Sequence, residues 1–142
     1  MRSLGVDVGS RRTGVAMSDP QGIFALPLTV IEHDSYDRVL GDIARLVEEY
    51  EIQRVVVGLP YSLNGDLGRQ ATEVKAFAER LSRLTEADIQ LWDERLSTVA
   101  ADRLMDEAGT RRRKRKGHRD AIAAAVILQG FLDSQVQSSP IT

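Results

Sequence analysis

The stretch from residue 2 to residue 18, RSLGVDVGSRRTGVAMS, constrains the fold more than any other part of this chain. In its segment LGVDVG, aliphatic side chains alternate with Gly5, Asp7 and Gly9. Successive side chains of a β-strand point to opposite faces, so one face is aliphatic and the other carries a lone carboxylate. The segment therefore predicts a strand that holds Asp7 at the mouth of an open groove, because the two glycines present no side chain to block a ligand.

The same stretch predicts a β-hairpin. A polar turn, Ser10-Arg11-Arg12, follows the first strand, and residues 13–18 form the pattern of a returning strand. Aspartate most often serves in turns or caps and is depleted from strand interiors. Because Asp7 lies inside the strand, we interpret it as functional, with a turn or capping role as the alternative.

Length and composition predict one soluble domain. The 142 residues are 42% hydrophobic and 28% charged, which is enough apolar material for one core. We expect a domain over residues 1–134 and a flexible tail over 135–142. The absence of cysteine excludes disulfides and thiolate metal sites. We find no signal peptide and no apolar run of membrane-spanning length, so we expect a cytoplasmic protein that does not enter membranes.

Positive charge is concentrated in one segment, RRRKRKGHR at residues 111–119. It holds seven of the 19 Lys and Arg residues and none of the 21 acids, although the net charge of the chain is −2. Like charges in a row repel one another, so the segment indicates either a binding site for a polyanion or a solvated loop. We favour nucleic-acid binding through Arg11, Arg12, Arg111, Arg112, Arg113, Lys114, Arg115, Lys116 and Arg119.

The remaining patterns predict an α/β fold. We expect strands over 23–31, 54–59 and 88–92, and helices over 36–50, 69–84, 97–108 and from 120 onward. Pro27 indicates an edge strand, because proline cannot donate to the ladder. The continuously apolar run at 54–59 is typical of a strand covered on both faces.

A polar, glycine-containing loop follows the strand at 54–59. Open α/β sheets place ligand groups at such strand ends, so Ser62 to Gly68 could offer backbone N–H groups to a substrate. Tyr61 could stack on a base, although local packing is the commoner role of a lone loop tyrosine.

Three carboxylates stand out for their position: Asp7 in the first predicted strand, Glu94 after the last one and Asp120 at the head of the last helix. Each has a simpler explanation alone: Asp120 could stabilise a helix N-terminus, and Glu94 could pair with Arg95 on the surface. Together they suit Mg²⁺ or Mn²⁺, which prefer oxygen ligands and need few protein carboxylates. Two such ions can activate water and stabilise the leaving oxygen of a phosphodiester.

Four strings in order resemble the YqgF/RuvX family of bacterial nucleases: GVDVGSRRTGVAMSD, VVVGLPYSLNGDLGRQA, WDERLST and the stretch from Lys116 through DAIAAAVILQGFLD. The resemblance covers almost the whole chain. It implies a ribonuclease H-like fold, with a mixed five-stranded sheet whose first three strands are antiparallel and last two parallel. It also implies that the family's acidic triad, which is catalytic and binds metal, falls on Asp7, Glu94 and Asp120.

The resemblance is imperfect before the last of these acids. His118 and Arg119 stand where relatives often carry a basic or apolar pair. An arginine beside a metal-binding carboxylate either competes with the ion or holds a phosphate.

From these observations we expect metal-dependent hydrolysis of nucleic-acid phosphodiesters. The family resemblance implies either 5′ processing of pre-16S ribosomal RNA, which we favour, or Holliday-junction resolution. Two other classes stay open: a sugar-kinase or actin-like ATPase, which needs two such domains, and a non-catalytic RNA-binding factor in transcription or ribosome assembly. The oligomeric state, monomer or weak dimer, is not determined by the sequence.

Overall fold

The strands form one mixed sheet in the order β3-β2-β1-β4-β5. The computed structural model describes residues 1–60, 68–94 and 119–138. The strands are β1 (Ser3–Asp7), β2 (Arg12–Ser18), β3 (Ala25–Glu32), β4 (Arg54–Leu59) and β5 (Asp88–Asp93), and the described helices are α1 (Tyr36–Glu49), α2 (Arg69–Leu84) and α4 (Arg119–Ser138). β1, β2 and β3 pair antiparallel, whereas β4 and β5 run parallel to β1. The predicted fold class and strand directions are therefore confirmed.

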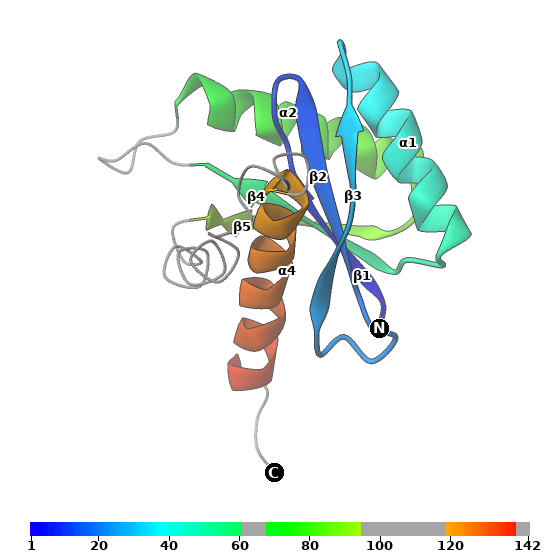
Figure 1. Cartoon of the computed structure of the whole chain (residues 1–142), viewed down its shortest axis with the longest axis vertical. Coiled ribbons are helices and arrows are strands. Elements are labelled where there is room, and N and C mark those ends of the chain that lie inside the picture. The colour runs from blue at the N-terminus through cyan, green and yellow to red at the C-terminus, as the bar shows by residue number, and fades with distance from the viewer. Residues whose placement is uncertain (61–67, 95–118, 139–142) are drawn as a thin grey trace.

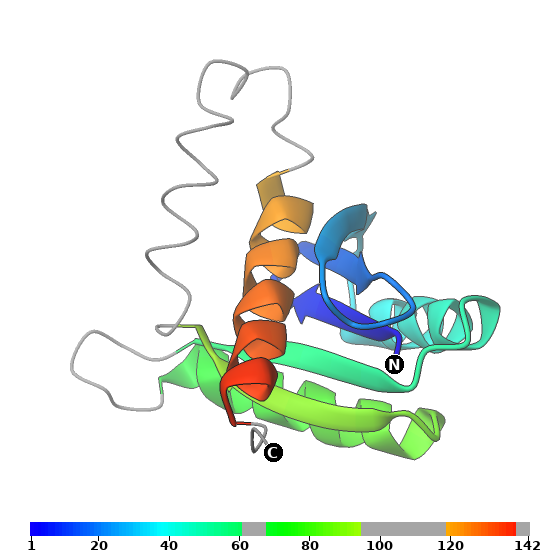
Figure 2. The ribbon, with the colours of Figure 1, turned by 90° about the horizontal axis from the view of Figure 1, so that it is seen from below.

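Helices cover both faces of the sheet. Figure 2 shows α1 and α2 on one side of it and α4 on the other. The apolar stripe of α1 and that of α2 pack with Val6, Val55 and Val57 in one core. Val56, which points to the opposite face of β4, packs with α4 in a second core. β4 is thus buried on both faces, as its continuous apolar run predicted.

α4 lies directly on the face of β1 that carries Asp7. A Cβ built on Gly5 would stand 2.6 Å from Leu128 Cβ and 2.7 Å from the Ala124 carbonyl oxygen, so only glycine permits this approach. The expectation of an open groove along this face is therefore wrong beside Gly5, where the helix fills it. The groove was expected because the sequence does not tell which helix covers which face.

The last helix is longer than predicted. α4 continues to Ser138, so its last four residues lie in the stretch expected to be a flexible tail. Residues 139–142, and the helix expected over 97–108, lie outside the described residues. None of the described helices is long and apolar enough to cross a membrane.

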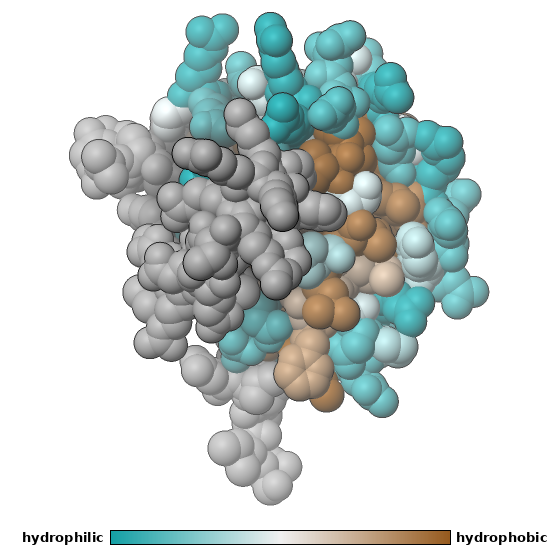
Figure 3. Space-filling model, viewed as in Figure 1, coloured by the Kyte–Doolittle hydropathy of each residue, from teal (hydrophilic) through white to brown (hydrophobic). Residues whose placement is uncertain are grey.

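β3 is an edge strand, as Pro27 predicted, but it begins two residues later than expected. The reason is a turn in which the N–H groups of Ile23 and Phe24 donate to Asp19 Oδ1 at 2.7 and 2.8 Å. These backbone groups are then not free to join the ladder. Figure 3 shows apolar side chains gathered along this edge, among which Phe24 and Leu26 are 65% and 67% exposed.

The outer edge of β3 is partly blocked by a side chain of α4. Gln129 Oε1 accepts a hydrogen bond from the Ala25 N–H at 2.9 Å, and its Nε2 donates to the Ile23 carbonyl at 3.0 Å. Pro27 has no N–H to offer. The amide of Gln129 thus takes the place of a neighbouring strand, which limits edge-to-edge pairing.

Candidate catalytic site

Asp7 is the last residue of β1, not an interior residue as predicted, and lies between two glycines of the neighbouring strands. It pairs with Gly14 of β2, and Gly58 of β4 is one residue beyond the pair formed by Val6 and Val57. Glycine is unfavourable inside strands and often marks a place where another group approaches closely. The sheet therefore leaves free space on both sides of the Asp7 carboxylate.

The space over Gly14 is taken by the start of α4. A Cβ at Gly14 would lie 1.9 Å from the Asp120 carbonyl oxygen and 2.9 Å from the Ala121 nitrogen. Only a glycine lets the first turn of α4 rest on β2 at this level. Because Gly14 is paired with Asp7, this contact brings Asp120 to the same end of the sheet as Asp7.

The space over Gly58 is shared by Glu94 and by Ile127 of α4, whose Cδ1 would lie 2.5 Å from a Cβ built on Gly58. Glu94 follows the end of β5, and its Oε1 would lie 2.7 Å from the same Cβ. The side chain therefore extends across β4 toward β1, where the carboxyl groups of Glu94 and Asp7 share a hydrogen bond. The parallel strands β1, β4 and β5 all end here, which is where open α/β sheets place ligand sites.

The two acids in contact are difficult to ionise together. Burial raises the pKa of Asp7 to about 6; the hydrogen bond from Glu94 lowers it and the charge of Asp120 raises it. Burial, then the charge of Asp7 and the shared hydrogen bond, raise the pKa of Glu94 to about 7. The shared hydrogen bond lowers the pKa of Asp7 and raises that of Glu94, as expected if the Glu94 carboxyl donates it and Asp7 accepts it. Burial and mutual repulsion therefore both oppose the ionisation of Asp7 and Glu94.

The structure places the predicted basic residues in two groups. Arg11 and Arg12 are exposed at the β1–β2 turn, and Arg119 is exposed at the first position of α4. The rest of the basic segment, residues 111–118, lies outside the described residues, as do Arg95, Tyr61 and residues 62–67. Gly68, the last residue of the loop expected to contact substrate, is the N-cap of α2.

Sequence reasoning missed the two glycines that shape the site. Gly14 lies in an otherwise regular strand pattern and Gly58 ends an apolar run, and glycine is uncommon in both settings. That irregularity was a usable signal. What it could not tell is which groups, the start of α4 and the Glu94 carboxyl, would occupy the space.

Two comparisons bear on the family of this chain. Its residues 1–134 match the family model described as RuvX, Holliday junction resolvase. A protein of Desulforamulus reducens is 46% identical over 134 residues, which cover 94% of this chain and 98% of that protein. The chain belongs to the RuvX family. A RuvX relative from Bacillus cereus is 47% identical over 141 residues, and both relatives carry the name "Putative pre-16S rRNA nuclease".

Solved structures show the same fold at low sequence identity. RuvC of T. thermophilus, in complex with a Holliday junction substrate, superposes with a TM-score of 0.67 at 14% identity over 98% of both chains. The Fowlpox virus resolvase, also in complex with Holliday junction DNA, gives a TM-score of 0.58 at 12% identity over 96% of this chain and 99% of that one. The ribonuclease H-like architecture expected for a RuvX protein is therefore confirmed.

The donor set of this RuvX site suits a divalent cation. Among residues 1–60, 68–94 and 119–138, no three Asp, Glu, His or Cys side chains already form a ready metal cage. Asp7 and Glu94 nonetheless lie in contact, and Asp120 is close enough for its charge to act on Asp7. Binding an ion between them would require Glu94 to lose its proton and break its hydrogen bond to Asp7. Carboxylate oxygens are the ligands that Mg²⁺ and Mn²⁺ prefer.

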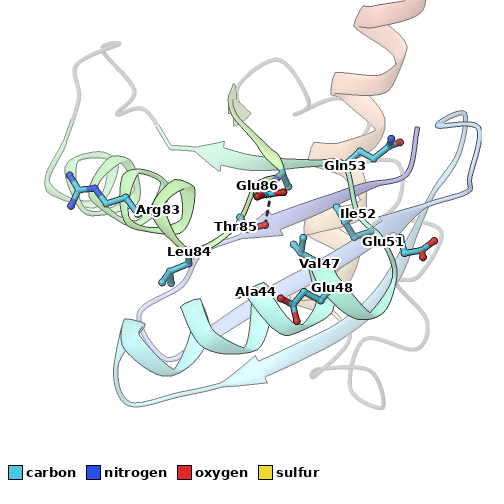
Figure 4. Close-up of a pocket in the computed structure, with 11 residues that line it drawn as sticks. Ala44, Val47, Glu48, Glu51, Ile52, Gln53, Arg83, Leu84, Thr85 and Glu86 are labelled. Carbon is cyan, nitrogen blue, oxygen red and sulfur yellow. Dashed lines mark hydrogen bonds between the residues drawn. The ribbon is translucent and has the colours of Figure 1, made fainter.

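A larger pocket lies away from the carboxylate site. It measures about 820 Å³ and is found between the C-terminal ends of α1 and α2, as Figure 4 shows. Its lining includes Glu48, Glu51 and Glu86, against one base, Arg83. Such a lining repels a polyanion, and the pocket is at the opposite end of β4 from Gly58. It therefore does not belong to the carboxylate site.

The raised pKa values predict a change in the free energy of unfolding of this RuvX protein in buffer free of divalent cations. Between pH 4 and pH 8 it should fall relative to that of the Asp7→Asn variant. In that window the folded state holds protons that the unfolded chain has released, so the stabilisation present below pH 4 disappears as pH rises past the folded-state pKa values. A shift of about two pKa units at Asp7 is worth on the order of 3 kcal/mol. We expect Asp7→Asn to equal the parent near pH 4 and to exceed it at pH 8.

The measurement is chemical denaturation with EDTA at several pH values. The difference in stability between the two proteins reports on Asp7 and on Glu94, whose pKa depends on Asp7, since the carboxylates away from this pair titrate equally in both. Equal stabilities at pH 8 would show that Asp7 is not held in a charge-poor environment.

Proposed function

We propose that this RuvX protein is a metal-dependent nuclease that hydrolyses nucleic-acid phosphodiesters, with the 5′ end of pre-16S ribosomal RNA as its main substrate. The observation that carries the proposal is the contact between Asp7 and Glu94 at the ends of β1 and β5, with Asp120, at the start of α4, close enough for its charge to act on Asp7. Burial raises the pKa of both Asp7 and Glu94, so ionising this pair is costly to the fold, which suits a functional rather than a stabilising role. The names of the relatives supply the substrate.

The three acids would hold Mg²⁺ or Mn²⁺. Divalent ions bound there supply an activated water on one side of the phosphodiester and stabilisation of the leaving oxygen on the other. Asp7, which contacts Glu94 and is acted on by Asp120, occupies the central position and would contribute to both halves of the site. Glu94 would release its proton to solvent before the site is competent, since a protonated carboxyl is a poor ligand.

Basic residues would hold the flanking phosphates without reading sequence. Arg11, Arg12 and Arg119 stand at the same end of the molecule as Asp7, and we assign the basic segment up to residue 116 the same role. Binding should therefore weaken steeply as salt concentration rises, because each phosphate contact releases counterions.

Holliday-junction cleavage is the second candidate, favoured by the description of the family model that matches residues 1–134. Resolving a junction takes two symmetric cuts and hence two symmetric active sites, whereas an enzyme that trims RNA needs only one. The two candidates thus differ in what they demand of the oligomeric state.

The decisive experiment compares cleavage of a 16S precursor transcript with that of a four-way DNA junction, each with Mg²⁺, with Mn²⁺ and with EDTA. We expect cut products only with a divalent ion, and faster cutting of the transcript. Preferred cutting of the junction would establish the second candidate. Tight RNA binding without any cleavage under these conditions would contradict the nuclease and favour the RNA-binding factor.

A further inference from the structure

We propose that a pocket at the end of the sheet where Asp7 lies binds one backbone phosphate of the substrate, next to the bond that is cut. The inference rests on the nucleic-acid substrate of the proposed function and adds a residue, Arg38, that the sequence did not single out. The pocket measures about 300 Å³. It is lined by Arg11, Arg12, Glu32, His33, Asp34 and Arg38.

The topology places this pocket close to Asp7. β1 ends, β2 begins and β3 ends at one end of the sheet, because the three strands are antiparallel, and α1 starts there after β3 (Figure 1). Arg12 precedes Gly14, the partner of Asp7, by two residues. That is about 7 Å along a strand. A strand of nucleic acid with its scissile bond at Asp7 therefore reaches the pocket with a phosphate one or two nucleotides away.

The three guanidinium groups are only loosely held by acids. Arg12 Nε lies 4.0 Å from Glu32 Oε1, and Arg38 Nε lies 3.9 Å from Asp42 Oδ2, both at the outer limit of an ion pair. Arg11 makes no ion pair with any residue of the described ranges. Exposed pairs of this kind contribute little, so a phosphate can replace them at small cost.

A buried histidine holds the β1–β2 turn, which carries Arg11, against the segment that leads into α1. His33, which is 5% exposed, joins the two: its backbone N–H donates to the Arg11 carbonyl at 2.9 Å, and its Nε2 lies 2.9 Å from Thr13 Oγ1. Burial lowers the pKa of His33, so the ring is neutral at pH 7 and adds no charge of its own. The ring therefore holds the β1–β2 turn against the residues before α1, and the pocket exists before any ligand arrives.

The charge of the lining favours an anion, although it includes Glu32 and Asp34. Three arginines oppose two acids, and Glu32 is 79% exposed, so its charge is strongly screened. Arginine forks match the geometry of phosphate oxygens, and they hold a backbone phosphate whatever the base.

The test compares Arg38→Gln with Arg45→Gln, which removes the same charge from the same helix. Arg45 also pairs with Asp42 but does not line the pocket. The probe is a short fluorescein-labelled single-stranded RNA, bound in EDTA and followed by anisotropy over a range of salt concentrations. We expect Arg38→Gln to weaken binding about tenfold, the effect of one charged hydrogen-bonding contact. It should also lower the salt slope by about 0.7, the value for one phosphate of a single strand.

A second arm locates the phosphate. Single methylphosphonate linkages, which carry no charge, replace each linkage within two nucleotides of the bond that the parent cuts. At one of these positions the neutral linkage should weaken binding to the parent and to Arg45→Gln. It should not weaken binding to Arg38→Gln, because that variant has already lost the contact between Arg38 and the phosphate.

The outcomes separate this inference from the proposed function. If Arg38→Gln binds with the affinity and salt slope of Arg45→Gln, the phosphate pocket is refuted, even if the parent protein cuts RNA normally. If the parent cuts nothing, the nuclease fails, yet the binding comparison in EDTA still decides the pocket. A neutral linkage that affects all three proteins equally at every position would also refute it.

Discussion

Asp7→Asn should reduce cleavage at least about a thousandfold, the equivalent of roughly 4 kcal/mol of transition-state stabilisation. The asparagine is isosteric but offers no negative charge, and Asp7 is the acid that contacts Glu94 and is acted on by Asp120. The variant therefore lacks the carboxylate that lies close to both of the other acids of the site. RNA affinity in EDTA should stay within a few-fold of the parent, because the basic residues are untouched.

The matched control is Asp88→Asn, which makes the same change at the exposed opposite end of β5 and should leave cleavage unchanged. Loss through misfolding is excluded by the stability of Asp7→Asn, which should exceed that of the parent at pH 8 without metal. Adding Mn²⁺ at pH 8 should raise the melting temperature of the parent and not that of the variant, since only the parent retains the ligand. Cleavage by Asp7→Asn at the rate of the parent would end the proposed mechanism.

Gly14→Ala should both destabilise the protein and inactivate it. The new Cβ would lie 1.9 Å from the Asp120 carbonyl oxygen and 2.3 Å from its carbonyl carbon, and these backbone atoms cannot swing aside as a side chain could. The start of α4 must then move away from β2 and carry Asp120 with it. We expect a loss of about 3 kcal/mol in the free energy of unfolding, typical of severe overpacking in a core.

Gly41→Ala is the control for this change. Gly41 lies inside α1 with no atom within 4 Å of a built Cβ, so the same substitution should stabilise the protein by about 1 kcal/mol through helix propensity and leave cleavage intact. Thermal melts and initial cleavage rates measure both effects. A Gly14→Ala protein as stable and as active as the parent would show that α4 does not rest on β2 as described.

The sequence by itself determined the order and kind of the described elements. Apolar spacing alone located α1, β4 and α2, and their observed bounds agree with the predicted ones to within a residue. Such patterns are local: whether a residue is buried depends on its spacing from its neighbours along the helix or strand. Pro27 marked the edge of the sheet for an equally local reason, its missing N–H.

The three acids were also singled out from the sequence, Asp7 from its place inside a strand pattern and Glu94 and Asp120 from their places at the ends of elements. Residue spacing could not show that Glu94 would reach across β4 to Asp7, because the distance between them depends on the strand order. The same is true of Arg38, which the sequence presents as one ordinary charge on an amphipathic helix. Only the antiparallel return of β3 brings the start of α1 to the β1–β2 turn and makes that arginine part of a pocket.

Tertiary structure alone decided what fills the empty positions. Gly5, Gly14 and Gly58 each leave space on the sheet, and the sequence led us to expect an open groove beside Asp7. In the fold, α4 occupies the space over Gly5 and Gly14, and Glu94 shares the space over Gly58 with Ile127 of α4. A missing side chain is a local property that the sequence shows, whereas the group that enters the space comes from more than 30 residues away along the chain and is chosen by the packing of the whole sheet.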